Sequence, residues 1–153
     1  YFKKMPFSRP YKFNRTIRMT LATTQISIKK WHQMLETNDM SVLNDLLADE
    51  IVFRSPVAYK PYEGKQVVFF ILTNVIQVFQ DFTYHREFFT EDGENVVLEF
   101  SANVSGKSLK GIDMIRFNDR GQIIDFEVMI RPMSGLAALA EQMGQRISQY
   151  QAT

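Results

Sequence analysis

The chain has 153 residues, of which 45% are hydrophobic and 13% aromatic, and its net charge is +1. This length fits one domain with a hydrophobic core of its own. The absence of cysteine excludes disulfides, thiolate metal sites and a cysteine nucleophile. Because no apolar run approaches the ~20 residues that span a bilayer, we expect a soluble, cytoplasmic protein with no membrane partner.

Charge is distributed unevenly along the chain. Residues 1–18 contain six Lys and Arg and no acidic residue, whereas the remainder holds 12 basic and 17 acidic residues. Such a basic segment either meets nucleic acid or acidic lipid, or is a leader outside the functional domain. We favour the second interpretation because the segment lacks periodicity and the body is acidic. We therefore expect an arm over residues 1–18, one domain over residues 19–153 and no nucleic-acid partner.

Helical periodicity marks the beginning of the domain. Apolar residues at helical spacing predict an amphipathic helix over 24–36. A second, shorter helix follows, with Asn38 or Asp39 as its N-cap and a stripe of Val and Leu as its buried face. The residues over 50–55 then predict a short strand.

The middle of the chain contains a loop and a very apolar segment. Two prolines disfavour a central strand over 57–63 and indicate a loop. The run over 65–82 has no turn signal for about four helical turns and predicts a helix that is covered on most sides. At the end of the chain, Pro132 at the first helical position begins a last amphipathic helix.

Between these helices, residues 82–131 predict four long strands rich in Val, Ile, Phe and Tyr. Three glycine-containing turns, at 91–95, 105–108 and 118–121, separate the strands. Connections this short join antiparallel neighbours. We therefore predict an α+β fold in which a curved antiparallel sheet wraps around helices and leaves a cone-shaped, ring-lined space.

This order of elements resembles the SnoaL-like branch of the nuclear transport factor 2-like (cystatin-like) superfamily. The resemblance covers residues 24–148 and is carried by the segments LLADEIVF at 46–53, YEGK at 62–65, GIDMIRF at 111–117 and GQI at 121–123. It implies a polyketide cyclase-like fold with a hydrophobic pocket inside the sheet, and a homodimer formed through the outer face of the sheet.

The resemblance leaves two functions open. One is a cofactor-free isomerase, cyclase or dehydratase that acts on a small apolar molecule by acid–base chemistry. The other is a non-catalytic ligand-binding or dimerisation module whose interior is filled by Phe side chains. The fold does not decide between them, since it carries many unrelated activities.

Asp113 is the candidate catalytic residue. It lies among apolar neighbours on a predicted strand, and SnoaL-like cyclases carry their acid–base carboxylate in a comparable Gly-x-Asp setting. A carboxyl group in an apolar pocket has a raised pKa and exchanges protons near neutral pH. The competing interpretation is an aspartate that only makes a structural hydrogen bond. The candidate ligand-binding residues are Trp31, Phe53, Tyr62 and Phe117.

Other chemistries find less support. Two histidines 53 residues apart make a weak ligand set, so we expect no metal, and no glycine-rich phosphate loop begins a helix. The Arg-x-Asp pair of the epoxide hydrolases is missing, and the Tyr and paired Asp of a ketosteroid isomerase are not placed. Strand alternation groups Tyr84 with Arg86 and His85 with Glu87, without deciding which group faces inward. His32 could reach the mouth of the cavity, but a surface position is the favoured interpretation.

Overall fold

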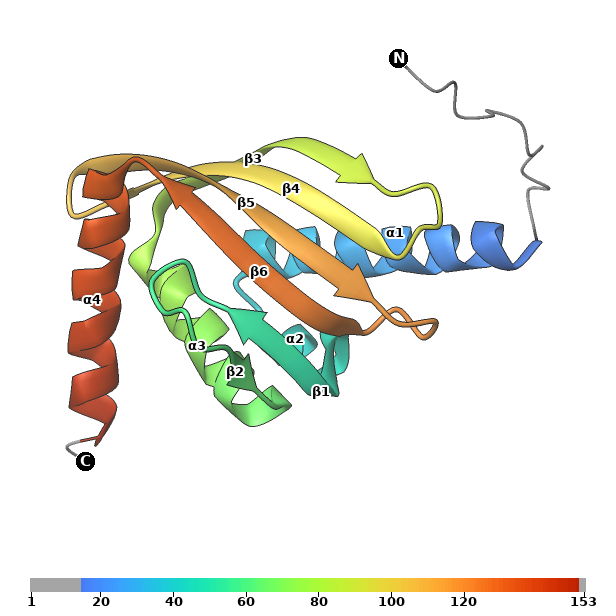
Figure 1. Cartoon of the computed structure of the whole chain (residues 1–153), viewed down its shortest axis with the longest axis horizontal. Coiled ribbons are helices and arrows are strands. Elements are labelled where there is room, and N and C mark those ends of the chain that lie inside the picture. Colours follow the sequence, from blue (N-terminus) through green and yellow to red (C-terminus); the bar gives the residue numbers. More distant parts are fainter. Residues whose placement is uncertain (1–14, 152–153) are drawn as a thin grey trace, which may run out of the picture.

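The computed structural model describes residues 15–151 (Figure 1). The helices are α1 (Arg15–Thr37), α2 (Ser41–Leu46), α3 (Lys65–Val78) and α4 (Met133–Gln151). The strands are β1 (Leu47–Arg54), β2 (Tyr62–Glu63), β3 (Gln80–Phe89), β4 (Asn95–Val104), β5 (Lys107–Phe117) and β6 (Ile123–Arg131). Most of the predicted arm lies outside the described residues, but residues 15–18 already belong to α1, which begins well before the predicted residue 24.

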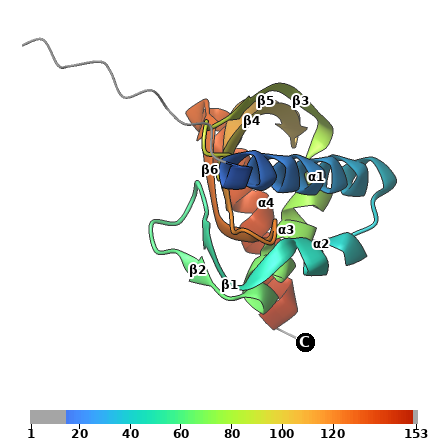
Figure 2. The ribbon, with the colours of Figure 1, turned by 90° about the vertical axis from the view of Figure 1, so that its right-hand side faces the viewer.

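The strands form a single sheet in the order β2-β1-β6-β5-β4-β3. Every neighbouring pair from β3 to β6 is antiparallel, as the short turns predict. β1 joins β6 in parallel, which no local signal predicts because five elements separate these strands along the chain. The sheet curves over α1 (Figure 2). The predicted α+β fold, with a curved sheet wrapped around helices, is therefore confirmed.

The three turns of the meander each contain a glycine with a positive φ angle. These angles are 76° at Gly93, 74° at Gly106 and 72° at Gly121. Residues with a Cβ are disfavoured in this region, so glycine allows each hairpin to reverse within a few residues. The predicted turns are confirmed at all three positions.

Two of these turns are attached to α1 by buried hydroxyl groups. Thr24 Oγ1 donates a hydrogen bond to the Gly93 carbonyl at 2.7 Å, and Ser27 Oγ donates to the Gly121 carbonyl at 2.6 Å. A Cβ at Gly93 would lie 2.5 Å from the Cα of Leu21, so a larger residue does not fit there. These contacts fix α1 against the ends of the hairpins.

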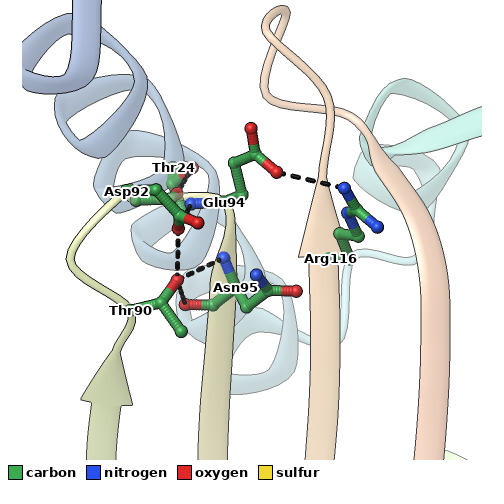
Figure 3. Close-up of polar contacts among 7 residues, drawn as sticks. Thr24, Thr90, Asp92, Glu94, Asn95 and Arg116 are labelled. Atoms are coloured by element: carbon green, nitrogen blue, oxygen red, sulfur yellow. Dashed lines mark hydrogen bonds and ion pairs between the residues drawn. The ribbon is translucent and has the colours of Figure 1, made fainter. Parts of the chain in front are cut away.

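Polar side chains also brace the turn between β3 and β4 (Figure 3). Asp92 accepts the Thr90 hydroxyl at 2.6 Å and the Glu94 N–H at 2.9 Å. Thr90 in turn accepts the Asn95 N–H at 3.0 Å. Arg116, on β5, donates to Glu94 at 3.1 Å and so links the turn to β5. The turn is therefore held from within and from β5.

The beginning of α2 and β1 differs from the prediction. Met40 precedes α2 and no side chain caps the helix, so the predicted cap at Asn38 or Asp39 is wrong. Asp39 instead accepts the N–H and the hydroxyl of Ser41 and closes a local turn. β1 begins at Leu47 rather than at residue 50, because α2 passes directly into it.

The predicted helix over 65–82 ends too late. α3 stops at Val78, and Phe82 lies within β3. An uninterrupted apolar run does not separate a buried helix from the strand that follows it. Within the predicted loop, Tyr62–Glu63 pairs with β1 as a short strand, and α4 begins one residue after Pro132.

Two clusters of buried apolar side chains form the core. The larger combines α1, α2, β1 and α3 with inward side chains of β4, β5 and β6. The smaller includes Phe100 and Leu139 and joins α4 to the sheet. α4 also packs beside α3 (Figure 1), where Arg146 donates to Gln77 at 2.9 Å. No helix within residues 15–151 is long and apolar enough to cross a membrane.

Candidate active site

A cavity of about 740 Å³ lies between the sheet and helices α1, α3 and α4. Its wall includes the rings of Phe53, Phe79, Phe82, Phe100 and Phe126, and apolar side chains of α3 and α4 complete it. Ligand pockets in proteins commonly occupy about 300–1,000 Å³ and are mostly apolar. The cavity thus has the size and lining suited to a small apolar molecule.

The aromatic wall depends on a glycine in β5. Gly111 pairs with Phe100 on β4, and a Cβ at Gly111 would lie 2.4 Å from the Phe100 ring. Phe100 stacks on Phe82 with ring centroids 5.1 Å apart, and Phe82 meets the Tyr84 ring edge-on at 4.8 Å. The missing side chain at Gly111 therefore lets this group of rings pack directly on β5, two residues from Asp113.

A chain of hydrogen bonds crosses the apolar interior. Trp31 Nε1, on α1, donates to the Tyr84 hydroxyl at 2.9 Å. The Tyr84 hydroxyl, on β3, donates to Asp113 Oδ2, on β5, at 2.7 Å. All three side chains line the cavity. The tyrosine thus connects the helix to the carboxyl group and fixes the orientation of both.

Burial controls the ionisation of the two hydrogen-bonded acidic groups, the Asp113 carboxyl group and the Tyr84 hydroxyl. Asp113 is only 5% exposed. Burial raises the pKa of its carboxyl group from 3.8 to about 7, although the hydrogen bond from Tyr84 opposes this change. Burial, together with the negative charge of Asp113, raises the pKa of the Tyr84 hydroxyl well above 10. Tyr84 therefore remains a hydrogen-bond donor at neutral pH, where Asp113 can gain or lose its proton.

A histidine and a glutamate lie beside these hydrogen-bonded side chains. His32, on α1, lines the cavity, and its Nε2 lies 2.9 Å from Glu87 Oε2 on β3. The His32 ring packs edge-on against the Tyr84 ring with centroids 5.1 Å apart. The side chains of His32 and Glu87 are about one-third exposed. His32 thus contacts the Tyr84 ring on one side and the Glu87 carboxylate on the other.

An irregularity in β3 brings Glu87 to this side of the sheet. Tyr84 pairs with Phe100 and Glu87 pairs with Leu98, so three steps along β3 match two along β4. Simple alternation would place Tyr84 and Glu87 on opposite faces, but one extra residue restores both to the same face. The grouping of Glu87 with His85 from alternation is therefore wrong.

The structure gathers four of the five predicted site residues around the cavity. Trp31, Phe53, Tyr62 and Asp113 are among its lining residues. Phe117 shares the inward face of β5 with Asp113 but does not line the cavity. It lies at the end of β5, opposite Ile123, and is buried in the larger core cluster.

The sequence did not identify Tyr84 as the partner of Asp113. The two residues lie 29 positions apart on strands that are separated by β4, so only the completed sheet reveals the pair. The edge-on contact of His32 with Tyr84 is likewise created by the placement of α1. Within residues 15–151, no three His, Asp or Glu side chains lie close enough together to hold a metal ion.

Comparison with known proteins identifies the family. The model of the SnoaL-like domain matches residues 28–126, and the chain belongs to this family. It is 54% identical to a steroid delta-isomerase from Pseudomonas aeruginosa, whose crystal structure superposes with a TM-score of 0.83 over 86% of this chain and 96% of that one. No curated protein matches the chain.

More distant structures share the fold. A bacterial protein from Silicibacter pomeroyi with a cystatin-like fold is 34% identical, with a TM-score of 0.75 over 80% of this chain and 85% of that one. An NTF2-like protein of unknown function from Mesorhizobium loti is 18% identical, with a TM-score of 0.63 over 72% of this chain and 93% of that one. The latter likeness concerns the fold alone.

Proposed function

We propose that this protein is a cofactor-free isomerase that binds a small, mostly apolar ketone and moves a carbon–carbon double bond by proton transfer. The observation that carries the proposal is the buried carboxyl group of Asp113, which lines an apolar cavity and has a pKa of about 7. Such a group exchanges protons with a carbon acid near neutral pH. The 54% identity to the steroid delta-isomerase supports the same class of reaction.

The reaction needs only one carboxylate to carry the proton. In its ionised form, Asp113 takes a proton from the carbon between the carbonyl group and the double bond of a β,γ-unsaturated ketone. The electrons of that C–H bond form a dienolate. Asp113 then returns the proton to the γ-carbon, so that the double bond becomes conjugated with the carbonyl group and no atom is gained or lost. The hydrogen bond from Tyr84 holds the carboxylate in place during both steps.

The shape and lining of the cavity favour a bulky apolar substrate. The wall is mostly apolar and rich in aromatic rings, and Asp113 and Tyr84 add a hydrogen-bonded polar pair to it. An apolar skeleton gains free energy from leaving water for such a wall, whereas a single carbonyl group requires a polar end. A 3-ketosteroid combines both features and is the substrate class we propose.

The test is turnover of a β,γ-unsaturated 3-ketosteroid by the wild-type protein and by Asp113→Asn, followed through the absorbance of the conjugated product. General acid–base catalysis contributes typically about 100-fold or more, so we expect kcat to fall at least that far in the variant. Glu99→Gln is the matched control, because Glu99 pairs with Lys110 and does not line the cavity. Unchanged turnover by Asp113→Asn would remove the catalytic proposal.

Binding is measured separately from turnover. Trp31 is the single tryptophan of the chain and lines the cavity. Its fluorescence should change when a saturated 3-ketosteroid binds, both in the wild-type protein and in Asp113→Asn. A protein that binds the steroid but does not isomerise it would be a ligand-binding module, the alternative function that the family resemblance leaves open. The cavity of about 740 Å³ argues against the version of that alternative in which Phe side chains fill the interior.

We also propose that a second copy of the chain covers the outer face of the sheet. Phe88, Val97 and Met114 are direct neighbours across β3, β4 and β5. Phe88 is 53% exposed and Met114 is 39% exposed. On β6, Met129 is 49% exposed and lies two residues from Glu127, which pairs with Met114. A two-fold interface would bury this row against its copy, since such an interface uses the same patch on both subunits.

A further inference from the structure

Isomerisation through Asp113 leaves the substrate oxygen without a partner. When the carbon-bound proton leaves, negative charge accumulates on the carbonyl oxygen, and a donor aimed at this oxygen lowers the barrier. The Trp31 N–H is already donated to Tyr84, and the Tyr84 hydroxyl is donated to Asp113. The donors of Trp31 and Tyr84 are therefore both occupied, and the reaction requires another.

His32 is placed to fill this role. Its ring lines the cavity and packs against the Tyr84 ring, which carries the hydroxyl bound to Asp113. Because Nε2 faces Glu87 at 2.9 Å, Nδ1 is the nitrogen left for a ligand. The extra residue in β3 that turns Glu87 toward α1 makes this arrangement possible, and such irregularities often re-aim side chains beside active sites.

We propose that His32, oriented by Glu87, is the second proton-transfer residue of the site and binds the carbonyl oxygen of the substrate. This inference rests on the isomerase function proposed above. It assigns the carbon-bound proton to Asp113 and the oxygen to His32. Both side chains line the same cavity, His32 from α1 and Asp113 from β5, and both contact Tyr84, so one ketone can meet both.

The proton balance closes without any additional reagent. As Asp113 takes the proton from the α-carbon, His32 donates an Nδ1 hydrogen to the oxygen, and a dienol forms. As Asp113 returns its proton to the γ-carbon, the dienol oxygen gives the hydrogen back to Nδ1. The product is an isomer of the substrate, and both protein groups regain their starting states.

The deciding variant is His32→Phe, which keeps a ring against Tyr84 but has no nitrogen. With the β,γ-unsaturated 3-ketosteroid as probe, we expect kcat to fall about 100-fold. The affinity for the saturated 3-ketosteroid, read from Trp31 fluorescence, should fall less than about tenfold, which corresponds to the loss of one hydrogen bond. Glu87→Gln should cause a smaller fall, because an amide still holds Nε2. In His32→Ala, free imidazole in the buffer should restore part of the lost rate, which a purely structural role would not allow.

The other histidine provides the control. His85 is exposed, contacts Ser101 at 2.7 Å and does not line the cavity. His85→Phe should turn over the probe at the wild-type rate. A kcat for His32→Phe within about threefold of wild type, or a loss in His32→Ala that imidazole does not restore, would overturn the assignment of His32.

The two proposals fail in different ways. If Asp113→Asn is inactive and His32→Phe is active, the isomerase function stands and the role of His32 falls. If the wild-type protein neither isomerises the probe nor exchanges its α-proton with deuterium from D₂O, the isomerase function falls and the role of His32 falls with it. Loss of activity in both variants, with binding retained, supports both.

Discussion

Replacing Asp113 by asparagine should change how the stability of the protein depends on pH. The pKa of this carboxyl group is about 7 in the folded protein, against an ordinary 3.8. The folded state therefore holds the proton more tightly than the unfolded state does. The free energy of unfolding must then fall as the pH rises from about 4 to about 7, and remain level above that range.

The magnitude follows from the difference between the two pKa values. Each tenfold difference in proton affinity corresponds to about 1.4 kcal/mol, so the wild-type protein loses about 4 kcal/mol across this range because of Asp113. The Asp113→Asn variant carries no charge at this position and avoids the loss, while its amide oxygen still accepts the Tyr84 hydroxyl. The variant should thus gain about 4 kcal/mol relative to wild type between about pH 4 and about pH 8.

Urea unfolding at a series of pH values, followed through Trp31 fluorescence, measures this difference. Glu99→Gln is the control, because Lys110 and Arg86 hold the pKa of the Glu99 carboxyl group at about 2. That carboxylate stays charged in both states above about pH 5, so the effect of Glu99→Gln should be constant there. If Asp113→Asn and wild type showed the same pH dependence, the carboxyl group would not be buried in the way the structure shows.

Two further substitutions test the hydrogen-bond chain and the outer face. Tyr84→Phe removes the hydroxyl between Trp31 and Asp113; urea unfolding should show a loss of about 1–3 kcal/mol. The pKa of Asp113 should also rise, because the Tyr84 hydrogen bond lowers it, and the fall in stability with pH should extend to higher pH. Met114→Glu should convert the proposed dimer into monomers in sedimentation experiments, because it places a charge in the apolar row; an unchanged mass would exclude this face. Met133→Glu, at an 84% exposed position at the start of α4, is the matched control.

Local patterns in the sequence were sufficient for most of the architecture. The turn glycines Gly93, Gly106 and Gly121 separate the strands of the meander, since the backbone reversal depends on a few adjacent residues. Boundaries were less accurate where helix and strand are both apolar, as at Val78, because periodicity fades over a few residues.

Only part of the candidate site could be predicted from such local patterns. Trp31 and Asp113 could both be selected from residue type and face alone. Asp113 was the clearer case, because a carboxyl group among apolar neighbours is conspicuous in a strand. Its partner Tyr84 could not, since the contact joins β3 to β5 across β4. Alternation assumes a regular strand, and one extra residue in β3 was enough to place Glu87 on the face of Tyr84 rather than on that of His85.

The chain thus encodes its turns, its strands and its isolated carboxylate in short stretches of neighbouring residues, where backbone sterics and periodic burial act. The ionisation of Asp113 and the contact between His32 and Glu87 depend instead on how α1 and the sheet close around the cavity. Burial and hydrogen bonding set the pKa of a carboxyl group, and both are properties of surfaces that meet only in the folded molecule.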